Sequence, residues 1–316
     1  MATTSAGILP AAPRQDAARG ILLMLGAVAV FSTMDALIKY LTVRYSPVQI
    51  IFFRNLFAFV PIFPLLMRSG GLSLLRTRRV GSHVTRAAMG LGAMVCFFTA
   101  FALMPLADVV AISLSAPIFV TAFSVPLLAE QVGPRRWAAV LVGFIGVLVM
   151  VRPGSAALND PVSFLPLVGA VLYALALIAM RKLGATERAP TTVFYFTLSC
   201  TVLSGLAQPF VWHTPDLADL ALLICVGLLG GSAQLLMTQA LRIAPAAVLA
   251  PFDYTGLVFS IVYGFAFWGE VPARVLLFGA AIVVASGLYI LHRETLRKRA
   301  RRLMPWASCR ASRSSA

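Results

Sequence analysis

Between residues 20 and 291 the chain consists of long apolar stretches separated by short polar segments. Within the stretches the apolar residues follow a helical period or fill every position, and none shows the strict alternation of a membrane β-strand. Each stretch is close to the roughly 20 apolar residues that a helix needs to cross a bilayer core of about 30 Å. The pattern predicts an all-α integral membrane protein with ten transmembrane helices, at residues 20–41, 48–67, 87–104, 107–129, 134–151, 162–181, 191–212, 217–239, 246–268 and 273–291.

Composition and charge agree with a membrane protein. The chain is 60% hydrophobic and 12% charged, whereas soluble domains are about half apolar and about a quarter charged. A net charge of +15 would suggest a nucleic-acid partner in a soluble protein, but here 21 of the 26 basic residues, Arg86 among them, fall in segments on one predicted side of the membrane. The opposite loops keep only Arg44, Arg152 and Arg274. By the positive-inside rule both termini are expected in the cytoplasm, and the location of the charge removes the reason to expect a nucleic-acid partner.

The two ends of the chain are predicted to be tails outside the helical bundle. Residues 1–18 have no apolar core of their own and are expected to be a disordered cytoplasmic tail. Residues 293–316 form a basic cytoplasmic tail that either grips anionic headgroups or only anchors the last helix. The first apolar run is too long for a signal-peptide core, so no cleavage is expected. Three cysteines lie within predicted helices and Cys309 lies in the tail, which indicates no disulfide framework.

The chain also contains an internal repeat. Residues 26–54 align without gaps over residues 169–197, with matching Gly-Ala-Val, then Lys39 over Lys182, then a proline that opens the next helix. Residues 100–130 match residues 240–270, and both copies close on a glutamate. Matching Lys, Pro and Glu positions at nearly constant offsets are not expected from shared apolar composition alone.

The repeat divides the chain into residues 19–152 and 162–292, each with five predicted helices. Because five is odd, the second copy must enter the membrane from the opposite side. Inverted repeats are typical of secondary transporters, which hold their substrate near the membrane midplane between the halves.

Ten helices in two halves, a proline opening the second helix and a glutamate closing the fourth and ninth helices resemble the EamA family of the drug/metabolite transporter superfamily. The similarity covers roughly residues 20–292. "STMDALIKY" and "FFRN" look most like a subgroup of bacterial importers that includes riboflavin and S-adenosylmethionine uptake proteins. The resemblance implies uptake of a vitamin- or nucleoside-like metabolite; export of amino acids or drugs, as in other members of the superfamily, is the alternative.

Charged residues in the first two helices are the leading site candidates. Asp35 and Arg54 both lie roughly 9 Å beneath the predicted outer boundary, at 1.5 Å per helical residue. They can pair, and Lys39, one turn from Asp35, competes for the carboxylate or extends to the outer headgroups. Asp35 is too short to reach the headgroups, so an interior role is expected: carrying a proton, contacting substrate or pairing with Arg54.

The second half supplies further candidates. Asp253 and Tyr254 follow Pro251 in the ninth helix, and a proline there frees backbone carbonyls that can line a cavity. Pro117 in the fourth helix is expected to break that helix in the same way, although an ordinary kink explains either proline. Gln234 either faces the cavity or makes a hydrogen bond between helices.

Two glutamates are expected to have only structural roles. Glu130 and Glu270 lie at predicted membrane boundaries, where we expect contacts with the nearby Arg135/Arg136 pair and with Arg274 respectively.

Other functional classes fit less well. The three histidines lie at loops or helix ends, and the sequence contains no HExxH, GxSxG or GxxxxGK[ST] motif. An enzyme is therefore not expected, nor is a resident metal or cofactor. A membrane scaffold would explain the helices but not the unsymmetrical buried charges, and no loop resembles a channel filter. The expected partners are a small-molecule substrate and the lipid bilayer, and a homodimer is compatible with the sequence but not required.

Overall fold

The computed structural model describes residues 17–68, 71, 77, 79–128, 133–151, 161–184, 187, 189–244, 249 and 252–303. Every regular element among these residues is a helix. The elements are α1 (Ala17–Leu41), α2 (Pro47–Arg68), α3 (Val80–Leu103), α4 (Leu106–Ser113), α5 (Ala116–Leu128), α6 (Pro134–Val151), η3 (Pro161–Phe164), α7 (Leu165–Gly184), α8 (Ala189–Leu206), α9 (Gln208–Val211), α10 (Leu217–Ile243), α12 (Thr255–Trp268) and α13 (Arg274–Leu303).

The helices have the lengths of membrane spans. In the described part of the chain six are long and apolar enough to cross a bilayer, counting α4 with α5 as one, and four more are shorter apolar helices. The protein is therefore an all-helical, multi-pass membrane protein, as the hydrophobic pattern predicts.

Local sequence signals account for several helix ends. Proline stands at the first position of α2 and of α6, where its missing N–H group costs no hydrogen bond. Asp216 caps α10, because its carboxylate accepts the N–H of Asp219 at 2.7 Å. Gly269 ends α12 in the left-handed conformation, with φ of 65°.

The predicted break near Pro117 lies just before that residue. α4 ends at Ser113, and Leu114 and Ser115 form a turn in which the Ser115 hydroxyl donates to the carbonyl oxygen of Ile112 at 2.6 Å. Pro117 is the second residue of α5. A proline needs no N–H partner in a first helical turn, so it starts the second segment here. Pro251 lies outside the described residues.

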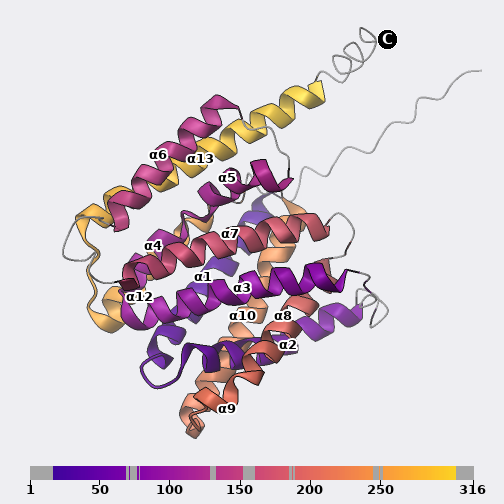
Figure 1. Ribbon diagram of the computed structural model, residues 1–316, viewed down its shortest axis with the longest axis vertical. Helices are drawn as coiled ribbons and strands as arrows, with labels where there is room; N and C mark the ends of the chain where they lie inside the picture. Colours follow the sequence, from indigo (N-terminus) through magenta and orange to yellow (C-terminus); the bar gives the residue numbers. More distant parts are fainter. Residues whose placement is uncertain are drawn as a thin grey trace, which may run out of the picture.

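Neighbouring helices in space come from distant parts of the chain. α1 packs against α10 and α12, α2 against α10 and α8, α3 against α7 and α8, and α4 against α12. α5 packs against α7, and α6 against α13. Figure 1 shows α6 and α13 side by side along one edge of the bundle. The largest apolar core joins α1, α2, α3, α4 and α10.

The α6–α13 pair meets at glycines. A Cβ added at Gly146 would lie 2.9 Å from the carbonyl oxygen of Gly279, and one added at Gly279 would lie 2.8 Å from that of Gly146. The two backbones are therefore in direct contact, which is how small residues bring membrane helices together.

Candidate functional site

Lys39 and Glu270 form an ion pair that ties three parts of the bundle together. Lys39 Nζ donates to Glu270 Oε1 and to the carbonyl oxygen of Met104. The second carboxylate oxygen, Glu270 Oε2, accepts the N–H of Leu106 at 2.9 Å. The Lys39 ammonium also lies 5.3 Å from the ring centroid of Trp268. We call this group the Lys39–Glu270 clasp.

Two local backbone features, the start of α4 and the turn at Gly269, position Glu270 in the clasp. Leu106 opens α4, and the first N–H groups of a helix have no partner within it, so Glu270 supplies an acceptor. The left-handed turn at Gly269 brings the N–H of Glu270 to the carbonyl oxygen of Gly264 at 3.0 Å. The expected contact of Glu270 with Arg274 is therefore wrong, because the turn directs the carboxylate back to α1. Glu130, its counterpart in the first repeat, lies outside the described residues.

Arg54 is buried and largely unpaired. Only 8% of the residue is exposed, its Nη1 donates to Asn55 Oδ1 at 3.1 Å, and its Nε has no hydrogen-bond partner in the described structure. Asp35 on α1 is near enough for the two charges to interact, but no ion pair within 4.0 Å forms between them. Their expected direct pairing stays a prediction. Lys39 contacts Glu270 rather than Asp35.

Arg86 is a buried cation, although the hydrophobic pattern predicts it in a cytoplasmic loop. It lies on α3, which begins at Val80 rather than at residue 87, and only 8% of it is exposed. Its Nη1 donates to the carbonyl oxygen of Thr192 at 3.4 Å, and its guanidinium carbon lies 4.3 Å from the ring centroid of Phe196. The predicted start of this helix was wrong because the first two turns of α3 are polar. The predicted helix, residues 87–104, was shorter than the roughly 20 residues of a membrane span, which could have indicated an earlier start.

Glycine makes room for this stacking. A Cβ at Gly90, one turn along α3, would lie 2.5 Å from a ring carbon of Phe196. The Phe196 ring can therefore lie flat against α3 beneath Arg86.

The two arginines are linked through α8. Cys200 is fully buried on α8, and the charges of both Arg54 and Arg86 act on its thiol. Tyr173 on α7 interacts electrostatically with Arg86 and with Asp253. Pairwise electrostatic interactions thus relate polar groups on α1, α2, α8, α3 and α7 and just before α12. We call these groups the central polar cluster: Asp35, Arg54, Cys200, Arg86, Tyr173 and Asp253.

The cluster is surrounded by protein and yet partly accessible. Asp35 is of intermediate exposure, Asp253 is exposed, and Tyr173 is 41% exposed, although all three lie deep among protein atoms. Tyr254 lies beside Asp253 at the start of α12. An ionised side chain in the membrane interior costs about 2.5–3.5 kcal/mol by insertion scales, so such groups are expected to face a partner, a ligand or water.

Gln234 lies on α10 and is of intermediate exposure. Its carbonyl oxygen accepts the Thr238 hydroxyl at 2.7 Å. Its side-chain amide makes no hydrogen bond among the described residues, so the expected bond between helices is not seen there.

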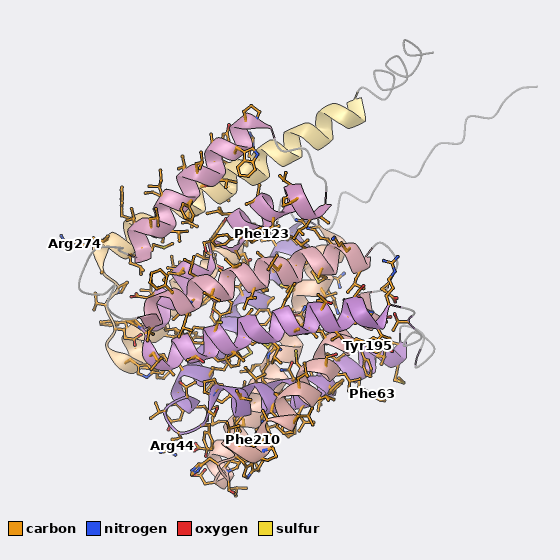
Figure 2. All side chains as sticks on the ribbon, in the orientation of Figure 1. Arg44, Phe63, Phe123, Tyr195, Phe210 and Arg274 are labelled. Carbon is orange, nitrogen blue, oxygen red and sulfur yellow. The ribbon has the colours of Figure 1, made fainter. Side chains whose placement is uncertain are left out.

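A second set of polar contacts joins the α1–α2 loop to the start of α10. Arg44 and Tyr45 both donate to Asp219 Oδ2, at 3.0 and 2.8 Å. Gln49 exchanges two hydrogen bonds with the backbone of His213, at 2.7 and 3.0 Å. Burial raises the pKa of the Tyr45 phenol, so it remains a donor at neutral pH. Figure 2 shows Arg44 at the periphery of the molecule.

A multi-pass helical bundle with charged side chains in its interior is an arrangement that membrane transport proteins share. The EamA-like transporter family model matches the chain twice, over residues 18–152 and 161–291. The chain belongs to the EamA-like transporter family, which confirms the resemblance seen in its sequence.

Relatives of this chain carry several transport functions. It is 31% identical over 283 residues to a riboflavin transporter of Rhizobium johnstonii, covering 89% of this chain and 93% of the relative. It is 32% identical over 271 residues to a pseudopaline exporter of Pseudomonas aeruginosa, covering 84% and 94%. It is 28% identical over 263 residues to an S-adenosylmethionine uptake transporter of Rickettsia bellii, covering 83% and 90%.

The fold also has a solved counterpart. A crystal structure 20% identical in sequence matches with a TM-score of 0.62 and covers 87% of this chain and 97% of its own. At this identity the match shows the fold alone. Family and relatives together place the protein among transporters rather than enzymes.

Proposed function

We propose that this protein is a secondary transporter that moves a small metabolite across the bacterial inner membrane by alternating access. Ten spans form two five-helix halves of opposite orientation, residues 19–152 and 162–292, between an N-tail at 1–18 and a basic C-tail at 293–316. Both termini lie in the cytoplasm. In support of this orientation, Arg44 and Arg274, from two loops predicted to be outside, lie towards the same end of the bundle in Figure 2.

The observation that carries the proposal is the reciprocal packing of the helices. In chain order, α1, α2, α3, α4–α5 and α6 correspond to α7, α8, α10, α12 and α13. Exchanging the two halves turns the α1–α10 contact into α7–α3, α2–α10 into α8–α3, and α1–α12 into α7–α5, all of which occur. The contacts α2–α8, α4–α12 and α6–α13 map onto themselves and also occur. The two separate matches to the family model give independent support.

Related halves of opposite orientation can exchange conformations and so open a central site to one side and then the other. In the proposed mechanism the substrate binds at the central polar cluster. The Lys39–Glu270 clasp closes one end, because it links α1 to the α3–α4 turn and to the end of α12. Asp35 and Arg54 contact the substrate or close the outward path. Asp253 and the adjacent Tyr254 serve the inward side, and Gln234 faces the cavity. The break before Pro117 and the one predicted at Pro251 provide the flexible points.

For the cargo we propose uptake of a vitamin- or nucleoside-like metabolite of the riboflavin or S-adenosylmethionine class. The names of two of the relatives support this choice. Export is the second candidate, and the pseudopaline exporter, of nearly equal identity, favours it.

The test is a transport assay with purified protein in liposomes, with and without a pH gradient. Riboflavin, S-adenosylmethionine and aromatic amino acids are offered as cargo, with empty liposomes as the control. Accumulation of a vitamin or nucleoside-like compound supports uptake, and movement only in the outward direction supports export. If no member of the panel is moved by protein that remains folded, the proposed cargo class is wrong.

A further inference from the structure

Two basic side chains in the described part of the bundle have carboxylate partners. Lys39 contacts Glu270, and Arg44 contacts Asp219. Arg54 and Arg86 are each 8% exposed, and neither has a carboxylate oxygen within 4.0 Å among the described residues. The chain therefore keeps two buried guanidinium groups whose charge no nearby ion pair neutralises.

Resting on the transport function proposed above, we propose that Arg54 and Arg86 form a receptor for an anionic group, a carboxylate or a phosphate, on the transported metabolite. Their neighbours are neutral acceptors: Asn55 Oδ1 for Arg54, and the Thr192 carbonyl oxygen and Met180 sulfur for Arg86. The Nε atom of each arginine is buried without an acceptor. A guanidinium offers a rigid fork of donors that matches carboxylate and phosphate oxygens, which are the partners missing here.

The two guanidinium groups approach one region from opposite ends of the bundle. Arg54 is seven residues into α2, roughly 10 Å from the start of that helix. Arg86 is six residues into α3, roughly 9 Å from its start. The two helices are predicted to run in opposite directions across the membrane. Cys200 is eleven residues into α8, roughly 16 Å from its start. Because both guanidinium charges act on Cys200, the two positive fields overlap in the middle of the bundle.

The acids of the cluster do not cancel this field. Asp35 interacts with Arg54 beyond ion-pair distance, whereas no carboxylate is among the groups that act on Arg86. Asp253 acts on Tyr173 and Tyr254 instead. Of the two arginines, Arg86 is therefore the one on which no carboxylate of the described residues acts.

The packing around Arg54 restricts the conformation of its side chain. A Cβ at Gly230 of α10 would lie 3.1 Å from Arg54 Nε and 3.0 Å from the Met34 sulfur. Because Gly230 has no side chain, Arg54 can occupy this space. A binding group that is held in place before the ligand arrives loses less freedom on binding.

The experiment measures binding to the purified full-length protein with pairs of probes that differ by one anionic group. Riboflavin 5′-phosphate is compared with riboflavin, and S-adenosylmethionine with its decarboxylated form. We expect the anionic member of at least one pair to bind about tenfold more tightly, as one well-placed charge-assisted contact allows. Arg54→Gln and Arg86→Gln each reduce that ratio towards one while the neutral member binds as before.

Matched variants separate charge from folding. Arg274 is exposed and lies at the edge of the molecule in Figure 2, so Arg274→Gln keeps the wild-type ratio. Arg54→Lys and Arg86→Lys keep the charge and part of the preference, which also tests the site if the glutamine variants do not fold. Wild-type protein with no anionic preference, or folded glutamine variants with the wild-type ratio, overturns the proposal.

The outcomes also distinguish this inference from the transport proposal. Anionic preference without transport in liposomes would contradict the proposed function alone. Transport of a probe without anionic preference would contradict the receptor alone.

Discussion

Basic side chains inside the bundle are stabilised in different ways. Lys39 is held by a carboxylate, a backbone carbonyl and an aromatic ring, so its charge is compensated by the protein itself. Among the described residues Arg86 has only weak polar contacts and an aromatic ring. A compensated charge is suited to holding helices together, whereas an uncompensated one is suited to binding a ligand that arrives and leaves.

The Lys39–Glu270 clasp gives the first prediction. Lys39→Gln leaves a largely buried carboxylate without its cation, so we expect a loss of about 3 kcal/mol in stability and a clear fall in transport. Exchanging the charges with Lys39→Glu and Glu270→Lys should restore part of both. Recovery is incomplete because a lysine at position 270 cannot accept the Leu106 N–H.

Thermal unfolding in detergent and initial transport rates in liposomes measure the two effects. Lys182→Gln is the matched control, because this exposed lysine is the repeat counterpart of Lys39. A double variant no better than the single ones would show that the charge pairing is not what matters.

At the scale of elements, sequence signals and the observed helix ends agree at several positions. Proline at the start of α2, aspartate before α10 and glycine after α12 act through the few residues around them, so they can be read directly from the chain. The start of α3 could not be read in this way. In its polar first turns His83 and Arg86 contact α8, so their burial comes from another element.

The glycine contact between α6 and α13 gives the second prediction. Gly146→Ala places a methyl group against the backbone of α13, and we expect it to destabilise the protein by about 1–3 kcal/mol. Gly81→Ala is the control, since a Cβ there meets no atom within 4 Å. Alanine in that open helical position should be neutral or stabilising by up to about 1 kcal/mol.

Thermal unfolding of both variants in the same detergent makes the comparison. Equal unfolding temperatures for the two would mean that α6 and α13 separate without cost, and that their contact does not contribute to stability.

At the scale of the whole molecule, the helices of one half contact those of the other more extensively than consecutive helices contact each other. α1 packs on α10, α3 on α7 and α6 on α13, so neither half encloses its own core. In the proposed mechanism, a small rotation of one half against the other changes the walls of the central polar cluster. This arrangement suits a site that opens to each side in turn.

The orientation of the molecule gives the third prediction. The excess of Arg and Lys on one side predicts a cytoplasmic C-terminus. A membrane-impermeant maleimide should therefore label Cys309 in inside-out vesicles but not in intact cells. Cys309→Ser removes the signal and serves as the control. Labelling of Cys309 in intact cells would reverse the proposed topology.

The hydrophobic pattern by itself determined the class of protein and the approximate position of most helices, and matching residue identities predicted the repeat. These properties depend on stretches of about 20 neighbouring residues or on the comparison of one stretch with another. Only the tertiary structure decided which charges are neutralised. Lys39 and Glu270 are 231 residues apart in the chain, and Arg86 meets Thr192 across 106 residues. The partner of a buried charge depends on which helices pack together, because a charge interacts strongly only with groups a few ångströms away.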